Sequence, residues 1–75
     1  MTLDEFVKAF AEELDDTPID EITPSTVYRE LDEWTSLTAL SIISMVDDRE
    51  EKALTGADLR SCKTIEELYQ LIQSK

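Results

Sequence analysis

The chain contains no histidine and a single cysteine, Cys62, among its 75 residues. These absences exclude a disulfide framework, a Cys/His zinc cluster, a Cys/His nucleophile pair and a Ser-His-Asp triad within one chain. We therefore do not expect the chain to be an enzyme. Because free cysteine usually packs as a small hydrophobic side chain, we expect Cys62 to fill a buried position beside the last helix.

Glycine, proline and long apolar runs are also scarce. With one glycine and two prolines in 75 residues, the chain has the size of one small domain, residues 1–75, with a single core. No apolar run approaches the roughly 20 residues needed to span a bilayer, and Met1–Glu5 lacks the positive start of a signal peptide. We expect a cytoplasmic protein.

Basic residues are the third scarcity. Seven Lys and Arg oppose eighteen Asp and Glu, which gives a formal charge of −11. The first 33 residues hold eleven of the acids, opposed only by Lys8 and Arg29. Nucleic acids and anionic membranes are disfavoured as partners, because phosphate contacts require the opposite charge. A basic protein surface is the expected partner.

Apolar residues at three- and four-residue spacing predict a first helix over about residues 3–14, opened by a capping box of Thr2 and Glu5. Pro18 follows its end. Residues 16–35 show no sustained periodicity but are too apolar for a free linker. We predict a long loop packed on the other helices, with one helical turn within Pro24–Arg29.

A second helix is predicted over about residues 36–50. One broad face of this helix carries the apolar side chains that we assign to the core: Ala39, Leu40, Ile42, Ile43 and Val46. Leu37 and Met45 fall on the opposite face, among small polar residues. Asp47 and Asp48 put negative charge near the helix C-terminus, where the macrodipole disfavours it. An exposed docking face with an acidic rim is one interpretation, and incidental surface residues are the other.

Two further helices complete the prediction. A turn and a short helix within Ala53–Arg60 point Leu54 and Leu59 inward. Thr64 and Glu67 form a capping-box pattern that opens a last helix ending near residue 73. Its inward stripe comprises Ile65, Leu68, Tyr69, Leu71 and Ile72. No strand pattern occurs, so the predicted fold is all-α, with three main helices and one short helix.

Ser36 lies where the second helix begins. A hydroxyl there is close to the unpaired N–H groups of the first turn, where the macrodipole favours an attached anion, so the position suits a phosphodiester. The alternative is an ordinary N-cap, because serine is among the residues preferred at that position.

The order of these features resembles the acyl carrier protein family: Thr35-Ser36-Leu37 stands at the family's Asp-Ser-Leu-like site, before a second helix that ends in acids. The resemblance implies that Ser36 carries 4′-phosphopantetheine, installed from coenzyme A by a separate magnesium-dependent phosphopantetheinyl transferase. Acyl groups of fatty acid or polyketide pathways would be held on it as thioesters. The implied monomer would shelter its cargo among core residues: Leu40, Ile43, Val46, Ile65 and Leu68.

The resemblance also implies that the second helix binds acyl-chain synthases and transferases that have basic docking surfaces. The implied contact residues are Leu37, Ser41, Met45, Asp47 and Asp48. Thr35 departs from the family pattern, which usually has Asp there, and Thr38 and Ser41 replace residues that are often acidic. Glu50 stands where an aromatic is common, so we expect it to turn to solvent while Tyr69 or Leu54 fills the space.

Two alternatives remain open from the sequence. One is a peptidyl, D-alanyl or aryl carrier, which would use the same site for an amino acid or an aromatic acid. The other is an acidic helical adaptor that carries no prosthetic group and binds a basic protein surface.

Overall fold

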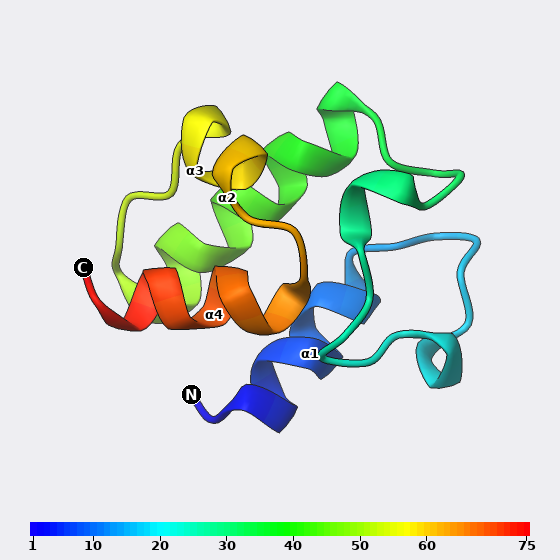
Figure 1. Ribbon diagram of the computed structural model, residues 1–75, viewed down its shortest axis with the longest axis horizontal. Coiled ribbons are helices and arrows are strands. Elements are labelled where there is room, and N and C mark those ends of the chain that lie inside the picture. The colour runs from blue at the N-terminus through cyan, green and yellow to red at the C-terminus, as the bar shows by residue number, and fades with distance from the viewer.

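Helices make up all of the regular structure in the computed structural model, which describes residues 1–75 (Figure 1). The elements in chain order are α1 (Leu3–Glu12), the 3-10 turns η1 (Ile19–Glu21) and η2 (Tyr28–Glu30), α2 (Ser36–Glu50), α3 (Gly56–Ser61) and α4 (Ile65–Gln73). The predicted all-α fold with one short helix is confirmed. None of the helices has the length and apolar character needed to cross a membrane.

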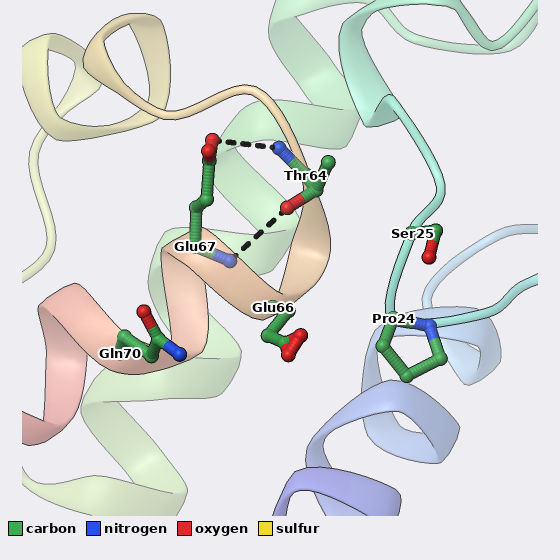
Figure 2. Close-up of a pocket in the computed structure, with 6 residues that line it drawn as sticks. All are labelled: Pro24, Ser25, Thr64, Glu66, Glu67 and Gln70. Carbon is green, nitrogen blue, oxygen red and sulfur yellow. Dashed lines mark hydrogen bonds between the residues drawn. The ribbon is translucent and has the colours of Figure 1, made fainter.

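Threonines open the helices, as the sequence predicts for two of them. Thr2 and Thr64 each form a complete capping box, with Glu5 and Glu67 respectively. Figure 2 shows the reciprocal bonds of the second pair. Helix α1 ends at Glu12, two residues before the predicted end, although Leu14 remains buried beyond it. The apolar spacing therefore continues past the end of the helix.

The long loop between α1 and α2 is fixed to the helices, as predicted. The carbonyls of Pro24 and Thr26 accept from the N–H groups of Glu66 and Ile65, at 2.9 and 3.2 Å. Two N–H groups of the first turn of α4, which have no partner within the helix, are thereby satisfied by the loop. The single turn predicted within Pro24–Arg29 lies slightly later, in η2, and η1 is a second turn that was not predicted.

Glu33 closes the same loop at its other end. Its carboxylate accepts from the N–H groups of Asp15 and Asp16 and from the hydroxyl of Thr17. These donors, the Thr17 hydroxyl above all, hold the pKa of Glu33 below its usual 4.5. The acid-rich loop is therefore ordered by one of its own carboxylates.

The core lies between the helices and the loop, and its buried side chains are all apolar, aromatic or sulfur-containing. They are Phe6, Ala9, Phe10, Ala11, Leu14, Ile22, Tyr28, Ile42, Met45, Val46, Leu54, Leu59, Cys62, Ile65, Leu68 and Ile72. The predicted inward positions of Leu54 and Leu59 and the buried position of Cys62 are confirmed.

The orientation of α2 about its axis differs from the prediction. Met45 is only 5% exposed and lies in the core, whereas Leu40 is 60% exposed. The predicted core position of Leu40, and with it a place in the cargo shelter, is therefore wrong, as is the predicted exposed position of Met45. Ile42 and Val46 are fully buried, and together with Met45 they define a core face rotated away from Leu40.

Glu50 also differs from the prediction. Its side chain is 11% exposed rather than turned to solvent, and its carboxylate accepts from the ammonium group of Met1 at 3.1 Å. Tyr69 donates to the carbonyl of Met1 at 2.8 Å. A partly buried carboxylate is tolerated here because it is paired with an opposite charge.

Candidate functional site

Ser36 is the first residue of α2, and Thr35 is its N-cap. Thr35 has extended backbone angles, and its side-chain oxygen accepts from the N–H of Thr38 at 3.3 Å. The hydroxyl of Thr38 in turn donates to the carbonyl of Glu33 at 2.8 Å. The interpretation of Ser36 as an ordinary cap is therefore wrong. Threonine and aspartate are both good N-cap residues, so Thr35 serves as a cap at the position where the resemblance leads us to expect Asp.

The hydroxyl of Ser36 is left free by this arrangement. The side chain is exposed, and the hydrogen bonds at the start of α2 involve Thr35 and Thr38 but not Ser36. The N–H groups of Ser36 and Leu37 have no partner within the helix, because they precede the first backbone bond, from Ala39 to Thr35. The first turn of α2 contains no acidic residue. An anion on Ser36 would therefore meet free donors, the positive end of the macrodipole and no neighbouring carboxylate of that turn.

A groove of about 340 Å³ adjoins Ser36 between η2, α2 and the short helix α3. Its lining comprises Arg29, Trp34, Thr35, Ser36, Ala39, Gly56, Leu59 and Arg60. The exposed hydroxyl, the free N–H groups and this groove together fit an arm that is linked through a phosphodiester.

Tyr28 and Arg29 in η2 hold α3 in place beside this groove. The Tyr28 hydroxyl, which is fully buried, donates to the carbonyls of Leu59 at 2.6 Å and Cys62 at 3.0 Å. Arg29 donates from Nη2 to the same Cys62 carbonyl at 3.1 Å. Burial raises the pKa of Tyr28 well above its usual value. The sequence analysis missed both residues as parts of the site.

The predicted docking residues do not all share one environment. Leu37 is 75% exposed, and Asp47 and Asp48 are exposed as well. Ser41 is half-buried, and its hydroxyl donates to the carbonyl of Leu37 at 3.2 Å. Met45 is enclosed in the core and cannot contribute to a surface.

Leu40 is the residue that the sequence analysis missed on this face. At one turn from Leu37, it places a second large apolar side chain on the exposed side of α2. The outer face of α2 therefore combines two exposed leucines with Asp47 and Asp48.

The class of protein defined by this fold and site is a small helical carrier. A family model described as "phosphopantetheine attachment site" matches residues 4–72. The chain belongs to this family, whose members attach 4′-phosphopantetheine covalently, and it is a phosphopantetheine carrier protein. Such carrier domains are not catalytic themselves and interact with transferases and synthases. The comparisons with curated proteins and with solved structures give no significant match.

Proposed function

We propose that Ser36 is the attachment residue, and that the chain acts as an acyl carrier for fatty acid or polyketide-type biosynthesis. The observation that carries the proposal is the exposed, unbonded Ser36 hydroxyl at the first residue of α2, next to a groove. When attached, 4′-phosphopantetheine supplies a terminal thiol that holds an acyl cargo as a thioester. The N–H groups of Ser36 and Leu37 would face the phosphate, and Thr35 and Thr38 would keep the helix start rigid.

The exposed face of α2 supports docking of a basic partner. Leu37 and Leu40 offer apolar contacts, and Asp47 and Asp48 are free to meet Lys or Arg. The excess of eighteen acids over seven basic residues favours charge-steered encounters with a phosphopantetheinyl transferase and with acyl-chain synthases. Because these charges are exposed, partner binding should weaken as salt rises.

A peptidyl, D-alanyl or aryl carrier would use the same site for a different cargo. The acidity of the chain favours the acyl type. An adaptor that is never modified is no longer favoured, because Thr35 rather than Ser36 is the N-cap and the chain belongs to the phosphopantetheine family.

The direct test is intact mass after incubation with coenzyme A, magnesium and a broad-specificity phosphopantetheinyl transferase. We expect one phosphopantetheine on the parent chain and none on Ser36→Ala. Ser44→Ala is the matched control, because Ser44 is another exposed serine of α2. This control should be modified like the parent. Modification of Ser36→Ala, or no modification of the parent by several transferases, would overturn the assignment.

A further inference from the structure

The groove beside Ser36 has an unusual charge for this chain. It is lined by two arginines, Arg29 and Arg60, and by no carboxylate. The other two surface hollows each include two glutamates among their lining residues. With eighteen acids in 75 residues, a purely cationic groove is a departure from the rest of the surface.

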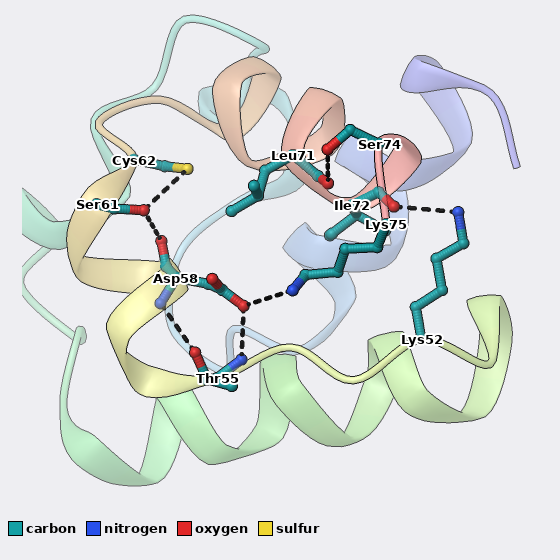
Figure 3. Close-up of polar contacts among 9 residues, drawn as sticks. All are labelled: Lys52, Thr55, Asp58, Ser61, Cys62, Leu71, Ile72, Ser74 and Lys75. Carbon is teal, nitrogen blue, oxygen red and sulfur yellow. Dashed lines mark hydrogen bonds and ion pairs between the residues drawn. The ribbon is translucent and has the colours of Figure 1, made fainter.

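Neither arginine is neutralised by an acid. The ion pairs of the protein join Met1 to Glu50 and Lys75 to Asp58, the latter at 2.9 Å. Figure 3 shows the Lys75 pair and the bond from Lys52 Nζ to the carbonyl of Ile72, at 3.1 Å, so these two lysines are engaged near the C-terminal end of α4. The charges of the groove therefore remain available to a ligand.

One of the two guanidinium groups, that of Arg29, is held in position by a hydrogen bond, and that of Arg60 lies beside Gly56. Arg29 donates to the carbonyl of Cys62, which leaves its other N–H groups free to bind. The guanidinium of Arg60 lies against Gly56, since its Nη1 would be only 3.4 Å from a Cβ at that position. Trp34, Ala39 and Leu59 supply apolar walls of the same groove. Apolar walls reduce the competition from water and strengthen a charge-assisted hydrogen bond.

We propose that Arg29 and Arg60 bind an oxyanion of the arm carried by Ser36. The oxyanion is either the phosphodiester itself or a carboxylate at the far end of the cargo, as in the half-thioester of a dicarboxylic acid. Both sources present the oxygen pair that a guanidinium recognises. The inference rests on attachment at Ser36 and adds an anion-binding function for the groove beside it. A preference for anionic cargo follows only if the cargo carboxylate is the oxyanion that is bound.

The test uses three forms of the chain whose loading is first verified by intact mass: the arm with a free thiol, with a butyryl thioester and with a succinyl thioester. The readout is solvent exchange of the arginine Nε–H groups by NMR. The chain has three arginines, and Arg49, which lies outside the groove, is an internal reference. An exposed guanidinium–oxyanion contact should slow exchange at Arg29 and Arg60 by about two- to fivefold and leave Arg49 unchanged.

The three forms distinguish the two sources. Exchange that is slower in the free-thiol form than in the chain without the arm identifies the phosphodiester as the bound oxyanion. Slowing that appears only in the succinyl form identifies the cargo carboxylate. In either case Arg60→Gln should remove the effect at Arg29, whereas Arg49→Gln should not. Because the side chain of Arg60 makes no hydrogen bond within the protein, its replacement is not expected to unfold the chain.

Two results would overturn the inference. One is unchanged exchange in all three verified forms. The other is slowing that first appears with butyrate and is equal with succinate, because a neutral cargo would then account for it. If mass analysis shows no arm at all, the attachment proposal fails instead, so the two failures are distinguishable.

Discussion

Replacing Tyr28 by Phe tests how α3 is held against the rest of the protein. The Tyr28 side chain is fully buried, and its hydroxyl donates to the carbonyls of Leu59 and Cys62. The substitution removes one oxygen and leaves the ring in place. The ring contacts with Phe10, at a centroid distance of 5.7 Å, and with Trp34, at 5.1 Å, should therefore persist.

The cost follows from the two carbonyls that lose their donor. Cys62 keeps the bond from Arg29, but no backbone N–H outside the regular helices reaches the Leu59 carbonyl. One buried acceptor is left without a partner, which costs about 1–3 kcal/mol. Since no cavity of methyl size is created, we expect Tyr28→Phe to lower the free energy of unfolding by about 2 kcal/mol.

Urea unfolding followed by fluorescence of Trp34, the single tryptophan, measures this change. Tyr69→Phe is the matched control, because Tyr69 is only partly buried and donates to one carbonyl, that of Met1. Water can replace that donor, so the control should lose about 1 kcal/mol or less. The dependence on urea should be the same in both variants. If Tyr28→Phe costs no more than Tyr69→Phe, the hydroxyl of Tyr28 does not hold α3.

Three further predictions concern the loop and α2. Glu51, the C-cap of α2, has a φ of 55°, a left-handed conformation that glycine adopts without strain. Glu51→Gly should therefore raise the free energy of unfolding by about 1 kcal/mol and the melting temperature by about 4–8 °C. Glu51→Gln, which removes only the charge, should have a smaller effect. Because the pKa of Glu33 is lowered in the folded state, its stabilising contribution is present above pH 4.5 and is lost as pH falls through the lowered value. Glu33→Gln should reduce stability at pH 7 and make the melting temperature fall less steeply as the pH is lowered into the acid range. Leu40→Ser should change the free energy of unfolding by less than about 0.5 kcal/mol but reduce kcat/KM for modification by the transferase about fivefold. If the variant and the parent have the same kcat/KM, Leu40 has no docking function.

Helix starts were predictable because they are encoded locally. Thr2 with Glu5 and Thr64 with Glu67 lie three residues apart, and each pair needs no other part of the fold to form its bonds. The predicted bounds of α2, about residues 36–50, agree with the structure. The alternative that made Ser36 the N-cap was wrong by one residue, because Thr35 and Ser36 are both good N-cap residues in sequence.

The core face of α2 could not be predicted in the same way. Apolar residues occur on nearly every side of this helix, from Leu37 and Leu40 on the surface to Met45 in the core. Periodicity fixes a face only when one side is clearly polar, as it is in α1 and α4. For α2 the spacing assigned Ile42 and Val46 to the core correctly, but the packing of the other helices decides which of Leu40 and Met45 is buried.

The groove depends still more on the tertiary fold. Arg29 and Arg60 belong to η2 and α3, and the link between those elements is made by hydrogen bonds from Tyr28 and Arg29 to the end of α3. The residue pair Tyr28-Arg29 therefore both anchors α3 and lines the groove. Loosening this anchor by Tyr28→Phe should also move Arg60 relative to Ser36. The capacity of the groove to hold an anion is thus coupled to the stability of the loop, although none of these residues is in the helix that bears the serine.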